Sequence, residues 1–599
     1  MLPVLFKDVL LLLAHANKQD SISLRSQILP LKRIIHLPFQ ITDMQTLHAL
    51  DYAVFLFYFM VVAGYGWWIY NKKKRTTADS KDYFLAEGSL TWWAIGASLI
   101  ASNISAEQFI GMSGAGFKMG LAIASYEWMA AATLIIVAVF FMPVYLKNKI
   151  YTMPQFLEQR YNGTVAMIMA IFWLMLYVGV NLTSILYLGA LAVSSISGFS
   201  FYICMAGIAL FAVVITLGGM KVIGYTDIVQ VFFLIVGGLA TTYLALNLVA
   251  DNYSGSGMIY GFNELLRNAP DHFHMIFKQA DPNFMDLPGL TVVAGGMWIA
   301  NFSYWGCNQY ITQRALGADL PTARKGILFA AFLKLLMPVI VVLPGIAAFV
   351  LHQQGNFAGE MMQDGELNPD RAYPVLLNLL PIGLKGLAFA ALTAAVVASL
   401  AGKANSIATI FSLDIYKKHL NKNADEAKLV LTGKIVIVVA MLLAVLISPF
   451  LGIDKKGGFQ YIQEYTGFVS PGIFAMFIMG FFWKKTTANA AMFATIGGFL
   501  FSIFLKFLPG ITDLYFLSAL GFAKANAAGV YEIPFLDRMG FVFAFCVAGM
   551  VIISSIQNLK VKETKGLEVD AAMFKVDNAF LSGAAIIVVA LIALYGYFW

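Results

Sequence analysis

Charged residues are scarce in this sequence. They occupy only 12% of its 599 positions, whereas a soluble protein carries roughly 25%. Hydrophobic residues make up 60% of the chain. A water-soluble fold of this composition would lack the polar surface that it has to present to solvent. The composition therefore predicts an integral membrane protein, and no soluble domain of useful size interrupts its apolar stretches.

Cysteine and histidine are also rare, with 3 and 7 residues. Cys204, Cys307 and Cys546 all lie in apolar stretches, so we expect buried packing rather than a disulfide framework. The sequence has no HExxH motif, no Walker loop, no Cys/His metal cluster and no GxSxG motif with a plausible base. It does not favour an enzyme, and no catalytic residue is nominated. No basic cluster with interleaved aromatic residues indicates a nucleic-acid partner.

Long apolar stretches recur along the whole chain. A helix needs about 20 apolar residues to cross a bilayer, and by this criterion the sequence predicts about fourteen transmembrane helices. They run roughly over residues 49–70, 91–114, 120–146, 163–195, 200–217, 221–249, 288–312, 325–352, 377–413, 429–450, 459–483, 487–508, 536–557 and 577–599. The predicted fold class is an all-α integral membrane protein.

Lysine and arginine gather in alternate loops, starting with residues 71–82. The positive-inside rule places these loops in the cytoplasm, so both ends of the fourteen-helix unit face outward. We therefore expect a multi-pass protein of the cell membrane, and a bacterial inner membrane in particular.

Residues 1–43 stand apart from this pattern. Their beginning resembles a short signal-peptide core, and their basic residues would lie on the wrong side of the membrane. A misassigned start and a peripheral extension both stay open. The rest of the chain divides into an extra N-terminal transmembrane helix with its cytoplasmic loop (44–82), a first inverted repeat (83–249), an extracytoplasmic loop (250–287), a second inverted repeat (288–483) and C-terminal transmembrane helices (484–599).

Polar residues interrupt two of the predicted spans at mid-depth, at residues 101–105 and at residues 301–304. The two spans are five apart, so they cross the membrane in opposite directions. This pattern is typical of a five-plus-five inverted repeat whose broken helices form a site near the midplane. The alternative is a pair of glycine-rich packing helices, but glycine explains neither Asn103 nor Gln108.

Several strongly polar residues lie in the apolar stretches. A charge near the bilayer centre costs at least about 2.5–3.5 kcal/mol, so such residues usually face a cavity. Glutamate accepts hydrogen bonds, lysine donates them, and amides do both, which suits a solute that carries a ring of hydroxyl groups. We predict a transporter of a sugar-like solute with these ligands: Gln108, Glu127, Asn301, Lys334 and Gln463. In the alternative interpretation, Glu127 and Lys334 form an ion pair that only fixes helix packing.

Other residues are candidates for closing the site and for binding a cation. Tyr304 is placed to stack on a sugar ring, while Met112, Tyr126 and Phe459 are placed to close over it. Sodium is a hard cation that prefers oxygen ligands.

The break in the first span frees the carbonyl groups of Ala101 and Ile104, and a facing helix offers the Ser399 hydroxyl. Asp227 is a candidate to receive an ion that leaves inward. Its alternative is an ordinary acid near a helix N-terminus, stabilised by the helix dipole.

Several long stretches resemble the sodium/solute symporter family, and within it the bacterial sodium/galactose and sodium/glucose symporters. They include GASLIASNISAEQFIGMSGAGF, GLAIASYEWMAA, YWGCNQYITQRAL and GGFQYIQEYTGFVSPGI, and the resemblance extends from about residue 50 to residue 599. The resemblance implies a leucine-transporter-type fold, alternating access and sodium-driven uptake of a hexose.

Carried over by position, the family's functional residues match those chosen above. The sugar ligands fall on the five polar residues already named, with Asn103 beside them. The outer gate falls on Met112, Tyr126 and Phe459, and the inner gate falls on Tyr304.

At the cation site the resemblance implies carbonyl ligands at Ala101, Ile104 and Ala395, followed by two adjacent serines. The second serine is Ser399, but Ala398 stands where the first is expected.

Lys403, four residues after Ser399, replaces an apolar residue of the family pattern. Three interpretations stay open. Sodium still binds and Lys403 points elsewhere; Lys403 acts as a tethered or protonatable cation, giving proton coupling or no coupling; or Lys403 snorkels to the cytoplasmic interface. A sugar sensor is a further alternative to a carrier. The sequence does not separate galactose, glucose, inositol and acetylated sugars, nor does it give the ion stoichiometry or oligomeric state.

Overall fold

Apolar stretches of this length fold as helices because only a helix satisfies every backbone group of a segment inside lipid. The computed structural model describes residues 47–72, 83–84, 90–363, 365–451, 458–526, 528–558 and 566–599. The predicted extension, residues 1–43, lies outside these ranges. The described helices belong to one unit, Gln45–Trp599.

The first half of this unit consists of helices, and labels that begin with η mark 3-10 or π segments. In chain order they are α4 (Ala49–Lys72), α6 (Trp92–Asn103), η1 (Glu107–Met112), α7 (Ser113–Met119), η2 (Gly120–Ala124), α8 (Ser125–Ile136), η3 (Val137–Phe141), α9 (Met142–Lys147), α10 (Met153–Arg160), α11 (Gly163–Leu176), η4 (Tyr177–Leu182), α12 (Thr183–Ser197), α13 (Phe201–Thr216), α14 (Gly219–Asn252), α15 (Met258–Asn268), η5 (Pro270–Phe273) and η6 (Pro282–Met285).

The second half continues in the same way and adds two short antiparallel hairpins, β1 (Met362–Gln363) with β2 (Glu366–Leu367) and β3 (Lys524–Ala525) with β4 (Tyr531–Glu532). Its helices are α16 (Leu290–Ala294), α17 (Gly296–Gly306), α18 (Gln309–Leu316), α19 (Leu320–Gln353), η7 (Pro369–Arg371), α20 (Ala372–Leu377), α21 (Leu384–Thr409), η8 (Ile410–Leu420), α22 (Glu426–Ile447), η9 (Ser448–Phe450), α23 (Gly458–Gly467), α24 (Ser470–Phe482), α25 (Ala488–Met492), η11 (Phe493–Gly497), α26 (Gly498–Phe507), η12 (Leu508–Gly510), α27 (Tyr515–Ser518), α28 (Phe535–Asn558), η13 (Ala571–Phe574) and α29 (Asn578–Tyr597).

The all-α prediction is confirmed, and helices occupy each of the fourteen predicted stretches. By length and hydropathy, 10 helices in the described ranges are able to cross a membrane, or up to 11 if α23 and α24, bent by 52°, form one span. Several predicted spans are divided into shorter helices. The count of fourteen therefore stays a prediction.

The first predicted interruption is present. Helix α6 ends at Asn103, Ile104 has extended backbone angles (φ −76°, ψ 115°), and η1 begins at Glu107. The position of the second interruption was predicted wrongly. Helix α17 runs without a break through residues 301–304, and the chain leaves the helix only at Cys307 and Asn308, before α18.

Local hydrogen bonds explain this shift. The Asn301 side chain donates to the carbonyl of Met297, one turn earlier (3.0 Å), so it is satisfied inside the helix. Asn308, by contrast, is extended (φ −109°, ψ 126°), and its side chain accepts a hydrogen bond from Tyr177. Asn301 therefore stays in the helix, and Asn308 lies outside it.

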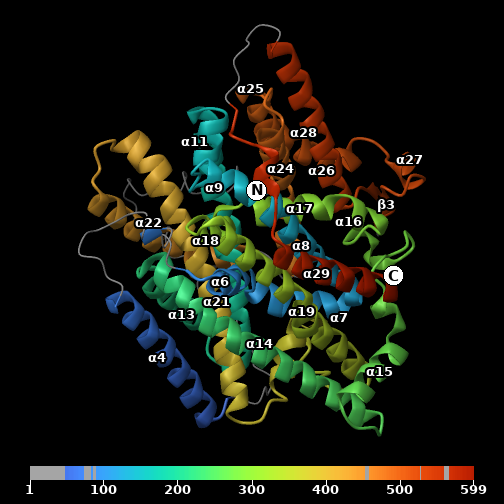
Figure 1. Ribbon diagram of the computed structural model, residues 1–599. Helices are drawn as coiled ribbons and strands as arrows, with labels where there is room; N and C mark the ends of the chain where they lie inside the picture. Colours follow the sequence, from blue (N-terminus) through green and yellow to red (C-terminus); the bar gives the residue numbers. More distant parts are fainter. Residues whose placement is uncertain are drawn as a thin grey trace, which may run out of the picture. The chain divides into compact units, whose positions relative to one another are not determined.

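Helix α19 packs against α6, α7 and α8, and Figure 1 shows it beside α14. Glycines permit the closest of these approaches. A Cβ atom on Gly345 of α19 would lie 2.1 Å from the Ser113 carbonyl oxygen, and one on Gly116 of α7 would lie 2.7 Å from the Val342 carbonyl oxygen. Backbone contact at this distance leaves no room for a methyl group, which fixes the spacing between α7 and α19.

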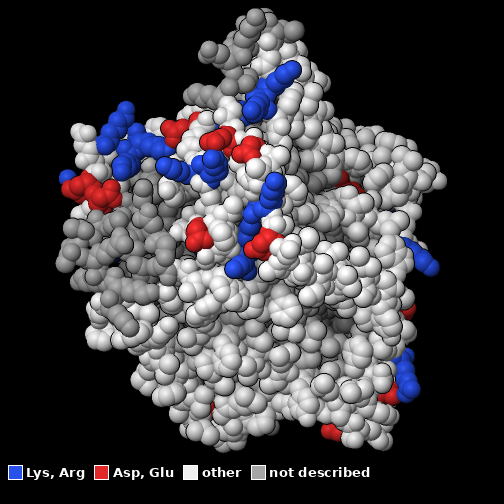
Figure 2. Space-filling view, in the orientation of Figure 1, with Lys and Arg blue, Asp and Glu red and all other residues white. Residues whose placement is uncertain are grey.

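Large apolar side chains cover much of the exterior. On α4, Leu56, Phe57 and Met60 are 59–65% exposed, as expected of a lipid-facing helix. Figure 2 shows charged side chains gathered over the upper part of the view, with a broad face below that carries almost none. This distribution fits a band of the surface that contacts lipid.

We predict that Gly345→Ala destabilises the protein by about 1–3 kcal/mol, because the added methyl group overpacks the contact between α7 and α19. A lowered melting temperature of the purified protein in detergent would verify this. Gly207→Ala is the matched control, since nothing lies within 4 Å of a Cβ at that helical glycine. Equal melting temperatures for the two variants would contradict the prediction.

Candidate solute and cation sites

A cavity of about 70 Å³ lies beside the break in the first span and is rich in polar side chains. All six predicted solute ligands line it: Asn103, Gln108, Glu127, Asn301, Lys334 and Gln463. They come from α6, η1, α8, α17, α19 and α23, so residues far apart in sequence converge on one small volume.

Lys334 forms the polar centre of this cavity. Its ammonium group donates to the Glu127 carboxylate and to the Asn103 side-chain oxygen, and it lies 5.0 Å from the centre of the Trp305 ring. Lys334 and Glu127 are only 1% and 3% exposed. The Glu127–Lys334 ion pair of the alternative interpretation is therefore present. It also forms part of the cavity wall that a solute would contact.

Two of the predicted outer-gate residues are aromatic and pack together at the wall of the cavity. Tyr126 and Phe459 both line it and pack edge to face, with ring centres 4.9 Å apart. Phe459 also lines a second cavity of about 960 Å³ that contains Asp370, Gln460 and Lys506. Phe459 thus lines both cavities, as expected if it acts as the predicted gate.

Met112, the third predicted outer-gate residue, is fully buried but does not line the small cavity. Tyr304, the predicted inner gate, does line it, and its hydroxyl accepts a hydrogen bond from Asn103 (3.0 Å). The Tyr304 ring packs edge to face on Tyr310, with ring centres 5.6 Å apart.

Glu107 is a cavity residue that the sequence analysis missed. The residue is 9% exposed, and its carboxylate accepts a hydrogen bond from Ser184 (3.2 Å). It meets the criterion that selected its neighbour Gln108, a strongly polar residue just after the break. That signal was therefore available in the sequence.

Three of the predicted cation ligands, Ala101, Ile104 and Ser399, lie at or beside the break in the first span. The Ser399 hydroxyl donates to the Ser102 carbonyl (3.0 Å), which joins α21 to α6. Ala101, Ile104 and Ala395 are at most 1% exposed. The Ser102 hydroxyl is buried and has no hydrogen-bond partner among the described residues. A set of carbonyl and hydroxyl oxygens fits a hard cation, and Ser102 is a candidate for the hydroxyl that Ala398 lacks.

Lys403 is also directed at this site. Its ammonium donates to the Ser399 hydroxyl (3.1 Å) and lies 4.4 Å from the centre of the Tyr310 ring. The side chain is 1% exposed. This geometry disagrees with the two interpretations that turn Lys403 toward another region or toward the cytoplasmic interface.

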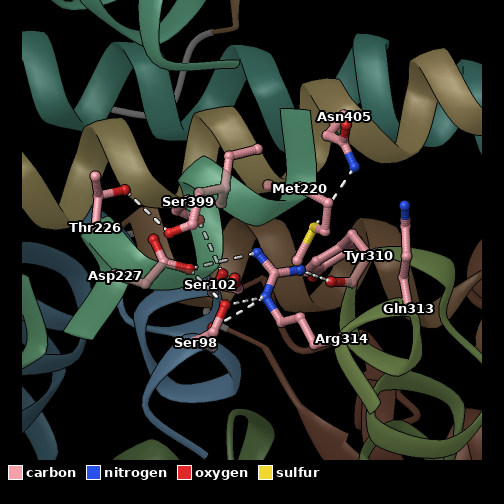
Figure 3. Close-up of polar contacts among 12 residues, drawn as sticks. Ser98, Ser102, Met220, Thr226, Asp227, Tyr310, Gln313, Arg314, Ser399 and Asn405 are labelled. Atoms are coloured by element: carbon pink, nitrogen blue, oxygen red, sulfur yellow. Dashed lines mark hydrogen bonds and ion pairs between the residues drawn. The ribbon is translucent and has the colours of Figure 1, made fainter. Parts of the chain in front are cut away.

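Asp227, the predicted ion-exit residue, belongs to a buried polar network next to Ser399 (Figure 3). Its carboxylate accepts a hydrogen bond from Ser98 (2.6 Å) and lies 3.9 Å from the Arg314 guanidinium. Arg314 also donates to the Ser98 carbonyl (3.0 Å) and to the Tyr310 carbonyl. Helix α14 begins at Gly219 and has no acidic residue in its first turn, so the partner of Asp227 is the buried Arg314 and not the helix N-terminus.

Comparisons with known proteins agree with this architecture. The model of the sodium:solute symporter family matches residues 83–498. A sodium/glucose cotransporter of Vibrio parahaemolyticus is 45% identical over 559 residues, which cover 92% of this chain and 98% of the relative. The human sodium/myo-inositol cotransporter 2 is 34% identical over 76% of this chain and 69% of its own length.

A solved structure of a Na⁺-coupled sialic acid symporter has a similar fold. Its TM-score is 0.69 at 21% identity, and the match covers 85% of this chain and 98% of that one. At this level of identity the likeness concerns the fold alone.

We predict that Glu127→Gln and Lys334→Met each destabilise the protein by about 3–5 kcal/mol, because each leaves one buried charge without its partner. The double variant should recover most of this loss, since it leaves no uncompensated charge. Thermal melts of the four proteins form a double-mutant cycle that measures the coupling.

Solute binding provides the complementary measurement. If Glu127 and Lys334 are solute ligands, the double variant melts near the wild-type temperature but no longer binds solute. A double variant that binds with wild-type affinity would instead assign the pair to packing alone.

Proposed function

Since the chain belongs to the sodium:solute symporter family, we propose that it is a secondary active transporter that couples the uptake of a galactose- or glucose-like sugar to sodium. The observation that carries this proposal is the convergence of four amides, an acid and a lysine, all predicted from the sequence, on one cavity. The sodium/glucose cotransporter among the relatives supports a hexose. We further propose a carrier without enzymatic activity, located in a bacterial inner membrane.

The chemistry of the cavity supports a polyhydroxylated solute. The Gln108 side-chain oxygen already accepts from the Ser105 backbone (3.0 Å), which leaves its amide hydrogens for a solute. Asn103 and Glu127 offer oxygens, while Lys334 offers hydrogens. Each sugar hydroxyl both donates and accepts, so it finds a partner of either kind here. A purely anionic solute would instead call for arginine.

Transport then follows from the two gates. A cation at the Ile104 break and Ser399 favours the state whose outer side is open, and sugar enters past Phe459. Closure of Tyr126 and Phe459 seals the outer side, and movement of Tyr304 opens the inner one. Coupling arises because each ligand binds one of these states more tightly than the other.

We expect purified protein in liposomes to accumulate labelled glucose or galactose when a sodium gradient is directed inward, and not when choline replaces sodium. Labelled sugar that exchanges for unlabelled sugar across the liposome membrane distinguishes a carrier from a sensor, which does not transport. Absence of both accumulation and exchange for every sugar in a panel of hexoses, inositol and acetylated sugars would refute the proposal.

Asn301→Ala should raise the KM for the sugar about tenfold, because a ligand hydrogen bond contributes on the order of 1–1.5 kcal/mol. Asn247→Ala is the matched control. Like Asn301, Asn247 donates to a carbonyl one turn earlier in its helix (2.8 Å), but it lies outside the cavity. The control should transport normally, and a similar loss in both variants would argue that Asn301 acts only through helix stability.

A further inference from the structure

The candidate cation site already contains a positive charge. The ammonium group of Lys403 lies 3.1 Å from the Ser399 hydroxyl, which is the one side-chain ligand predicted from the sequence. That hydroxyl in turn donates to the Ser102 carbonyl of the broken span. The ammonium therefore reaches, through Ser399, the same two helices that a bound cation would join.

Two cations and two acids surround this site, so their formal charges balance without an ion. Lys403 and Arg314 are each 1% exposed. The acids whose charges act on them are Glu107 for Lys403 and Asp227 for Arg314. A sodium ion added here would leave one positive charge in excess at a depth where uncompensated charge is costly.

We propose that the Lys403 ammonium and the transported sodium ion compete for the Ser399 hydroxyl, so that sodium enters the site only when Lys403 moves toward Glu107. This inference rests on the proposed function. It makes Lys403 a positioning residue that sets the concentration of sodium at which the carrier operates. A chain with an uncharged residue at this position would bind sodium more tightly.

Movement of Lys403 would also affect the proposed inner gate, Tyr304. Lys403 lies over the face of Tyr310, 4.4 Å from its centre, and a cation in this position attracts the ring. Tyr310 packs edge to face on Tyr304. When Lys403 moves away, Tyr310 loses this attraction. Tyr310 is then held less firmly, and so is the Tyr304 ring that packs on it. Displacement of the ammonium by sodium thus links sodium binding to the gate through Tyr310.

Sodium binding is measurable apart from transport. The melting temperature of the purified protein in lipid nanodiscs is recorded against sodium concentration, with choline chloride keeping the ionic strength constant. We expect Lys403→Met to lower the half-saturating sodium concentration at least tenfold, since an opposing charge within a few ångströms has been removed. Glu107→Gln should raise it, because the displaced ammonium then has no acid to approach.

Lys385→Met is the matched control. It removes a 5% exposed lysine from the same helix, α21, near that helix's first residue, and should leave the half-saturating concentration unchanged. A wild type without any sodium response, together with a response gained in Lys403→Met, would also support the competition. The opposite directions expected for Lys403→Met and Glu107→Gln cannot arise from general destabilisation.

Equal half-saturating concentrations in the wild type and Lys403→Met would overturn the inference while leaving sugar transport intact. If Lys403→Met does not fold, Glu107→Gln and Lys403→Arg decide instead. A Glu107→Gln response equal to the wild type overturns the inference, and a raised value for Glu107→Gln with a wild-type value for Lys403→Arg supports it. Failure of the wild type to transport sugar would refute the proposed function, and the melting curves would still report on Lys403.

Discussion

The break at Ile104–Ala106 frees backbone groups at a depth where lipid offers no hydrogen-bond partner. Side chains of the same segment replace the missing helix bonds. The Ser105 amide donates to the Gln108 side chain (3.0 Å), and the Glu107 amide donates to the Ser105 hydroxyl (3.1 Å). Ser399 meets a carbonyl from the end of α6. Residues of the candidate solute and cation sites thus also support the break, since each group left unsatisfied would cost several kcal/mol.

The buried charges likewise need partners. Lys334–Glu127 and Arg314–Asp227 are buried ion pairs, and the charge of the buried Glu107 acts on the buried Lys403. Pairing makes the charges tolerable but does not by itself stabilise the fold, because desolvation offsets much of the attraction. The buried charges are better explained by a function in which charged side chains change partners. A carrier requires such changes when it binds and releases its ligands.

The sequence predicted the helices and the first break well, because apolar length and a run of polar residues are local signals. It misplaced the second break because Asn301 and Asn308 look alike in sequence, and only the structure reveals that one bonds within its helix while the other bonds Tyr177. Arg314 lies outside the predicted spans 288–312 and 325–352, yet it is buried and lies beside Asp227. The sequence marked Lys403 as unusual, but its direction depends on how α18 and α21 pack together, which no local pattern records.

Asn103 has a special position because its two ends contact different parts of the molecule. Its nitrogen donates to Tyr304, and its oxygen accepts from Lys334. Without solute, Asn103, Tyr304 and Lys334 are hydrogen-bonded to one another. A sugar that binds to Asn103 therefore has to replace these hydrogen bonds with its own. A sugar hydroxyl that binds the Asn103 amide would leave the Tyr304 hydroxyl without its partner, and the proposed inner gate would lose a hydrogen bond. In the proposed mechanism, sugar binding would weaken the gate, and the sugar would shift the conformational equilibrium by the difference between its binding free energies in the two states.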